Sequence, residues 1–240
     1  MRFGSLFTGI GGLDLGLERA GFECMYQVEI DDFCRKVLTK RWPAVPKFGD
    51  ICEIKELPKT DLIAGGFPCQ DLSFAGKGAG ITGERSGLWK EFARIVATCK
   101  PKYVLIENVP ALRHRGMEVV LQDLARLGYD AVWDCVPASD FGAPFERKRL
   151  YIIAFPAGKL GAQRFRNEQK HDWKRSLFSS GDKRSPKADR AGWLQTEPNL
   201  GGVADGIPDR VDRVTALGNA VVPCAGEFFG RVITNLEKQI

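Results

Sequence analysis

The sequence has few of the residues that build metal centres and disulfide frameworks. Its two histidines, His114 and His171, are isolated, so neither a metal site nor a catalytic triad can be built on them. Its seven cysteines include no Cys-x-x-Cys pair, and their odd number argues against a disulfide framework. We therefore expect no bound metal, and a reducing compartment such as the cytoplasm.

Long hydrophobic runs are also missing. No apolar stretch is long enough to cross a membrane. The first residues reach several glycines and then Asp14 before a signal-peptide core could form. These absences predict a soluble protein with no membrane partner.

What is present is an ordinary globular composition of 240 residues, 44% hydrophobic and 27% charged. A chain of this length can bury one sizeable core and a small appendage. The formal net charge of +5 is compatible with a polyanionic partner but does not require one.

The beginning of the chain alternates short apolar strands with glycine turns, as in doubly wound α/β folds. Residues 2–6 and 22–28 are the predicted strands. The turn after the first strand contains Gly9, Gly11 and Gly12, which let the backbone pass close to a ligand. Asp14 stands where a dinucleotide-binding loop would have its third glycine. We therefore expect a nucleoside-like ligand and not a standard NAD or ATP loop.

Two acidic residues follow strands in this region. Glu29 stands where doubly wound folds hydrogen-bond ribose hydroxyls, although an acidic residue at a strand end is common. Asp50 can accept from an exocyclic amino group such as that of adenine, or it can cap a turn. Taken alone, each residue is compatible with ligand binding and with a local structural role.

A small-residue elbow, residues 65–73, follows the apolar run 61–64 and contains Cys69. Pro68 fixes its own φ, so Cys69 should lie on a stiff turn at the carboxyl edge of the sheet. Open α/β sheets have their ligand-binding and catalytic residues at this edge. An isolated cysteine is more often a small buried apolar residue. The glycine-rich residues 73–87 are interpreted as a mobile lid over a phosphate backbone, or as a solvated surface loop.

Polar residues also flank the later strands. The predicted elements are a helix at 88–97, a strand at 103–106, a helix at 116–127, and strands at 129–136 and 147–155. Glu107 and Asn108 follow an apolar strand and are costly to bury unless they bind something, or cap the next segment. Arg147 and Arg149 alternate onto one side of the last strand.

Together these motifs resemble the DNA (cytosine-5) methyltransferase family. The resemblance rests on Pro68-Cys69-Gln70 after two glycines, on Glu107-Asn108-Val109 and on Arg147-Lys148-Arg149, in the family's order, and it resumes at 217–223 before a helix to about Glu237. It implies a Rossmann-like core that uses S-adenosylmethionine. The residues that it implies for this cofactor are Phe7, Thr8, Gly9, Gly11, Gly12, Leu13, Glu29, Ile30, Asp50, Ile51, Pro68, Leu88, Asn219 and Ala220.

The resemblance also implies catalytic and DNA-binding roles. Cys69 adds to carbon 6 of a flipped-out cytosine, and Glu107 holds and protonates its ring nitrogen 3. Arg147 and Arg149 contact the base and support the site. The residues expected to contact DNA are Gln70, Ser73, Lys77 and Arg85. The chain departs from the family at Phe145, which stands where the family has glutamine.

Residues 156–212 lose the alternation of strands and helices. Between 156 and 200 there are ten basic and five acidic residues, with aromatic residues among them, which suits either a nucleic-acid surface or a solvated insertion. The family has its target-recognition domain here, usually much longer. We predict a catalytic and cofactor-binding domain at 1–155 plus 213–240 and a short recognition domain at 156–212, where 197–206 resembles a subgroup carried by phages and prophages.

The predicted function is that of a DNA (cytosine-5-)-methyltransferase of the restriction-modification kind. It would act as a monomer on double-stranded DNA in the cytoplasm of a bacterial host. Two alternatives stay open. One is a tRNA cytosine-5 methyltransferase, which the short insert favours although its expected signature is not visible, and the other is a non-catalytic DNA-binding relative.

Overall fold

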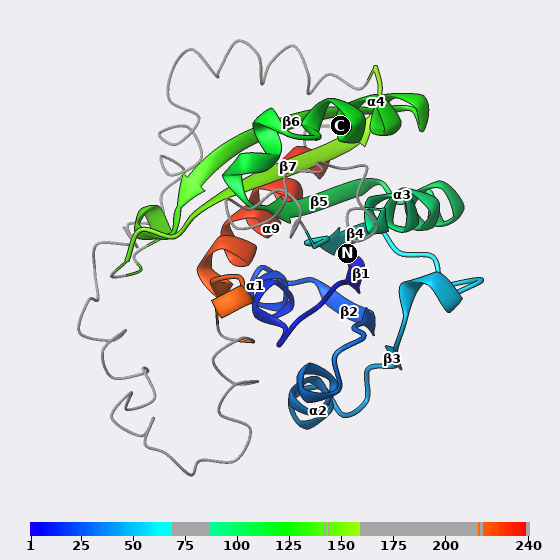
Figure 1. Cartoon of the computed structure of the whole chain (residues 1–240), viewed down its shortest axis with the longest axis vertical. Coiled ribbons are helices and arrows are strands. Elements are labelled where there is room, and N and C mark those ends of the chain that lie inside the picture. The colour runs from blue at the N-terminus through cyan, green and yellow to red at the C-terminus, as the bar shows by residue number, and fades with distance from the viewer. Residues whose placement is uncertain (69–86, 142, 144, 159–215, 217, 239–240) are drawn as a thin grey trace.

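In the computed structural model, the described part of the chain comprises residues 1–68, 87–141, 143, 145–158, 216 and 218–238. Its seven-stranded sheet has the order β3-β2-β1-β4-β5-β7-β6 (Figure 1). The strands are β1 (Arg2–Leu6), β2 (Glu23–Val28), β3 (Lys47–Phe48), β4 (Leu62–Gly65), β5 (Tyr103–Asn108), β6 (Tyr129–Pro137) and β7 (Lys148–Pro156).

The strand order creates a topological switch point in the middle of the sheet. From β1 the chain proceeds to β2 and β3 on one side, and then returns to β4 on the other side of β1. These strands and β5 are parallel, whereas β7 is antiparallel to both β5 and β6. The carboxyl ends of β1 and β4 therefore flank the kind of crevice in which open α/β sheets bind ligands.

Helices cover both faces of the sheet. They are α1 (Gly12–Arg19), α2 (Asp32–Arg41), α3 (Leu88–Cys99), α4 (Met117–Arg126) and α9 (Pro223–Glu237), with short 3-10 helices η1 (Ile51–Glu53), η4 (Pro110–His114) and η5 (Ala138–Phe141). Buried side chains of α3 and α4 pack in one hydrophobic cluster, and those of α1 and α9 in another. Strand β7 serves both clusters by alternation: Ile152 faces the first, and Tyr151 and Ile153 face the second.

The C-terminal helix completes the core of the first half of the chain. Figure 1 shows α9 crossing behind β5 and β7. The rings of Tyr151 and Phe229 lie 4.3 Å apart between their centroids. A Cβ on Gly16 of α1 would lie 2.1 Å from the carbonyl oxygen of Pro223, so the two helices approach each other closely. This contact joins residues that are more than 200 positions apart.

The doubly wound α/β fold expected from the sequence is confirmed. The predicted strands and helices are present with boundaries shifted by one or two residues, as is usual at element ends. Helix α2 was not predicted from the sequence. Its first turn is capped by Asp31, whose carboxylate accepts from the backbone N–H of Cys34 at 2.8 Å. Among the described residues, no helix is long and apolar enough to span a membrane.

Candidate active site

A pocket of about 510 Å³ opens at the carboxyl edge of the sheet, at the switch point between β1 and β4. Its volume lies in the usual range for small-molecule sites. Most of the residues that the sequence predicts for the site line it: Phe7, Thr8, Gly9, Leu13, Glu29, Ile30, Asp50, Ile51, Pro68, Leu88, Glu107, Arg147, Arg149, Asn219 and Ala220.

The glycine turn after β1 divides its residues between the pocket and the core. Gly9 lines the pocket with a φ of 57°, and no atom lies within 4 Å of the place where its Cβ would be. Gly11 and Gly12 are not among the lining residues. A Cβ on Gly11 would lie 2.5 Å from the ring of Trp42, and one on Gly12 would lie 2.0 Å from the carbonyl oxygen of Val221. In this fold these two glycines permit close packing behind the turn.

Asp14 forms a buried polar cluster beneath the same turn. Its carboxylate accepts from the Ser5 hydroxyl at 2.7 Å and from the Gln27 amide at 2.7 Å. Burial raises the pKa of Asp14 to about 6, and the two hydrogen bonds partly oppose this rise. Ser5 and Asp14 both line the pocket, but the sequence did not predict either as a site residue. Asp14 in the third-glycine position was the signal that could have found the cluster.

Glu29 and Ile30 follow β2 and occupy one wall of the pocket. The Glu29 carboxylate accepts from the backbone N–H groups of Gly9 at 2.6 Å and Asp31 at 2.9 Å. It therefore ties the glycine turn to the start of α2. The Ile30 side chain is 65% exposed although it is large and apolar. An apolar side chain at the edge of a pocket offers a surface on which a flat ring can pack.

Asp50 combines the two roles that the sequence left open. Its carboxylate accepts from the backbone N–H of Cys52 at 2.9 Å, which caps η1. Asp50 also lines the pocket together with Ile51 and, from the start of α3, Leu88. The turn-capping role is thus observed, and the position of the carboxylate is compatible with ligand contact as well.

The elbow after β4 brings the backbone close to the end of β5. A Cβ on Gly66 would lie 2.7 Å from Glu107 Oε2 and 3.1 Å from the Glu107 carbonyl oxygen. The amide of Asn108 donates to the carbonyl oxygen of Phe67 at 3.1 Å. Asn108 is buried, so this bond both satisfies its side chain and fixes the elbow. Pro68 is the last described residue of the elbow and lines the pocket.

Glu107 is a buried carboxylate paired with an arginine. Its Oε1 lies 3.2 Å from Nε of Arg149, which reaches it from β7. Burial raises the pKa of Glu107 to about 7, and the neighbouring Arg149 and Arg147 oppose this rise. A carboxyl group with such a pKa can hold or release a proton near neutral pH. This is the property required of a general acid.

Arg147 connects the pocket with the C-terminal segment. It donates to the carbonyl oxygen of Gly218, beside the pocket-lining Asn219 and Ala220. Its Nε is buried and has no hydrogen-bond partner in the described part of the chain. Burial and the nearby Arg149 lower the pKa of Arg147, while Glu107 raises it. Phe145, the departure from the family pattern, is 44% exposed.

The remaining predicted site residues fall outside the described ranges. They are Cys69, Gln70, Ser73, Lys77 and Arg85. Residues 73–86 of the predicted lid and residues 159–212 of the predicted insert also lie outside these ranges. Where residues are described, no group of three or more histidine, cysteine or acidic side chains is placed to hold a metal ion.

Comparison with known proteins identifies the family to which the chain is similar. The model of the C-5 cytosine-specific DNA methylase family matches residues 1–197. The type II methyltransferase M2.BsuMI of Bacillus subtilis is 42% identical over 162 residues, which cover 64% of this chain and 42% of that protein. The type II methyltransferase M.HhaI of Haemophilus parahaemolyticus is 38% identical over 161 residues, covering 65% and 49%.

The fold has matches among solved structures as well. A prophage-encoded protein of E. coli, described as a DNA modification methyltransferase, matches 74% of this chain and 50% of its own with a TM-score of 0.57 and 28% identity. The chain spans about half or less of the length of these relatives. Because the family model covers most of the sequence, the chain belongs to the C-5 cytosine-specific DNA methylase family.

Proposed function

We propose that this protein transfers a methyl group from S-adenosylmethionine to carbon 5 of cytosine in DNA. One observation carries the proposal: the buried Glu107 pairs with Arg149 in the pocket at the switch point, and Pro68, the residue before Cys69, lines the same pocket. Family membership supports the same reaction.

The pocket fits the cofactor in its residue chemistry. Gly9 leaves open space for a ligand beside its backbone, and the carboxylates of Glu29 and Asp50 can accept from hydroxyl and amino groups. Ile30 provides an apolar surface. We assign these residues, with Phe7, Thr8, Leu13, Ile51, Pro68, Leu88, Asn219 and Ala220, to cofactor binding. When bound, S-adenosylmethionine supplies an activated methyl group on a sulfonium.

The chain's own residues would prepare the cytosine. The base leaves the helix so that its ring becomes accessible. The Cys69 thiolate bonds to carbon 6 while protonated Glu107 gives its proton to ring nitrogen 3, and carbon 5 gains the electron pair with which it takes the methyl group. The carbon-5 proton then leaves to water, and its electron pair forms the double bond to carbon 6 as the bond from Sγ to carbon 6 breaks. The proton on ring nitrogen 3 returns to Glu107, which restores the neutral ring, the thiolate and the protonated carboxyl. Covalent addition splits one difficult step into easier ones.

Arg149 would hold the Glu107 carboxyl in the orientation that this transfer needs. It pairs with the carboxylate at 3.2 Å and is itself only partly exposed. Arg147, also in the pocket, is assigned to contact the base. We further propose that Gln70, Ser73, Lys77 and Arg85 contact double-stranded DNA, that residues 156–212 read the target, and that the protein acts as a monomer in the bacterial cytoplasm.

The test is transfer of labelled methyl from S-adenosylmethionine to unmethylated genomic DNA, followed by bisulfite sequencing. Methylcytosine in a fixed short context is the expected result. The Cys69→Ser variant should still bind S-adenosylhomocysteine and lose nearly all turnover, because it lacks the nucleophile. Full activity in that variant would rule out the covalent mechanism. Transfer to tRNA and not to DNA would favour the RNA alternative, and cofactor binding without transfer to either would favour a non-catalytic relative.

A further inference from the structure

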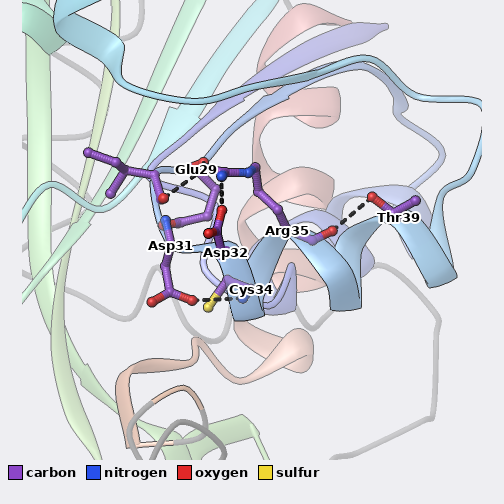
Figure 2. A network of polar contacts seen from close by, with 7 residues as sticks. Glu29, Asp31, Asp32, Cys34, Arg35 and Thr39 are labelled. Atoms are coloured by element: carbon purple, nitrogen blue, oxygen red, sulfur yellow. Dashed lines mark hydrogen bonds and ion pairs between the residues drawn. The ribbon is translucent and has the colours of Figure 1, made fainter.

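Arg35 of α2 binds the loop after β2, which forms one wall of the pocket. Its Nη1 donates to the carbonyl oxygens of Glu29 at 2.8 Å and Ile30 at 2.7 Å. A Cβ on Gly49 would lie 3.7 Å from the same nitrogen, so Arg35 also borders the loop that presents Asp50. Figure 2 shows the Arg35 side chain reaching back from α2 toward Glu29.

The two carbonyl bonds fix an unusual backbone shape. Consecutive carbonyl groups in a regular strand point to opposite sides, so one nitrogen can bind both only where the strand has ended and turned. With both carbonyl groups held toward α2, the side chains of Glu29 and Ile30 remain at the pocket, which they both line. Arg35 itself is not among the lining residues.

Arg35 is anchored on its own helix. Its backbone N–H donates to the Asp31 carbonyl oxygen at 2.9 Å. Its carbonyl oxygen accepts from the Thr39 hydroxyl at 2.8 Å (Figure 2). Its guanidinium also pairs with Asp32, whose side chain is 80% exposed. Exposed ion pairs of this kind contribute little. The carbonyl bonds are therefore the contacts by which Arg35 can influence the pocket.

We propose that Arg35 is a positioning residue for the adenosine half of the cofactor. It holds the Glu29 carboxylate and the Ile30 side chain in place through their backbone carbonyl groups, and it contacts neither the cofactor nor the reacting atoms. This inference rests on the proposed function, because it takes the pocket to bind S-adenosylmethionine. It predicts an effect on affinity and none on the chemical step.

The first experiment measures S-adenosylhomocysteine binding by calorimetry. Arg35→Ala should weaken binding about tenfold to thirtyfold, the effect of losing roughly two hydrogen bonds. Arg35→Lys, which keeps a donor for the carbonyl groups, should recover part of the loss, whereas Arg35→Met, which keeps only the apolar stem, should not. Asp32→Ala and the exposed Lys36→Ala are matched controls on the same helix and should bind as the wild type does.

Two further readouts separate positioning from general destabilisation. The KM for S-adenosylmethionine should rise while kcat at saturation stays unchanged. A double-mutant cycle with Glu29→Ala should be strongly non-additive, because both changes remove the same contact of Glu29 with the ligand. If Arg35→Ala and Arg35→Met bind within twofold of the wild type, or if the cycle is additive, the inference is wrong. Failure of the wild type to bind S-adenosylhomocysteine would instead overturn the proposed function.

Discussion

Two buried carboxylates in this pocket, Asp14 and Glu107, have opposite surroundings. Asp14 is held by two neutral donors beneath the glycine turn, whereas Glu107 faces Arg149. In both cases burial is the largest influence and raises the pKa, to about 6 and about 7 respectively. The folded protein therefore keeps protons that the unfolded chain has already released at the same pH. Both groups couple folding to pH in the same direction.

The stability of the protein should consequently fall as pH rises through this window. Protonation of both groups favours the folded state fully below about pH 4, and that contribution is lost as pH rises to about 7. The Glu107→Gln variant cannot titrate at this position, so its free energy of unfolding should decline less steeply between pH 5 and 7, by about 1 kcal/mol per pH unit. Urea unfolding at pH 5, 6, 7 and 8 measures this slope.

The exposed Glu53→Gln variant is the control for loss of a carboxylate that does not line the pocket. Wild type and Glu107→Gln curves that run parallel across pH 5 to 7 would contradict the assignment. Replacement of the protonated carboxyl by an amide also changes the contact with Arg149 at every pH, so a constant offset between the curves is expected and does not bear on the slope.

The sequence could predict the residues whose position depends on one element alone. Glu107 follows an apolar strand, and alternation places Arg147 and Arg149 on the same side of the last strand. That these residues share one pocket was implied by the family resemblance and not by periodicity. The cluster of Asp14 with Ser5 and Gln27 needs α1, β1 and β2 to be packed together, and no pattern in one segment encodes that. The contact of Arg35 with residues 29 and 30 was missed for the same reason, since α2 itself was not predicted.

At the scale of elements, α2 and β7 show what local patterns leave out. Helix α2 buries only Cys34 and Leu38 and is otherwise rich in charge, so its apolar stripe is too thin to be recognised. The direction of β7, in contrast, has a signal in the length of the connection that precedes it. The connection from β6 to β7 spans about ten residues, too few for the crossover that parallel strands need, and this length favours the antiparallel hairpin that is observed.

The packing of α1 against α9 gives a prediction at the same scale. A Cβ on Gly226 would lie 2.6 Å from the Leu13 carbonyl oxygen and 3.1 Å from the Gly16 Cα. By helix propensity alone, Gly226→Ala would stabilise α9 by about 1 kcal/mol. We expect instead a net loss of about 2 kcal/mol, because backbone atoms on α1 must move. Movement of α9 also shifts Val221, which lines the pocket, so S-adenosylhomocysteine should bind more weakly.

Gly230→Ala is the matched control for that experiment. A Cβ there would lie 2.6 Å from the Ala20 Cβ, at the end of the contact away from the pocket. It should lower the midpoint of thermal unfolding. At temperatures where the variant is fully folded, it should not weaken ligand binding. Thermal unfolding and calorimetry on both variants distinguish the cases. If the two substitutions change the affinity for S-adenosylhomocysteine equally, the prediction that the start of α9 positions the pocket is wrong.

At the scale of the whole molecule, the core is assembled from two separate stretches of chain. The second hydrophobic cluster combines residues 3–24 with the buried face of α9, including Phe229, Val232 and Ile233. Pocket-lining residues likewise come from both stretches, with Asn219 and Ala220 on the later one. The sequence indicated this arrangement only through the motif at 217–223. The division into a domain of 1–155 plus 213–240 and an insert at 156–212 stays a prediction.

Cleavage of the chain after Gly158 should therefore leave the core assembled. A specific protease site inserted at this position, where β7 has ended, would separate the core strands from α9 covalently but not remove their packing. The two fragments should co-elute in native gel filtration, separate in urea, and retain S-adenosylhomocysteine binding within a few fold. Phe229→Ala removes a buried ring and costs about 3 to 5 kcal/mol, so the cleaved form of this variant should dissociate. An N-terminal fragment that stays folded and binds the ligand after α9 is washed away would refute the two-stretch core.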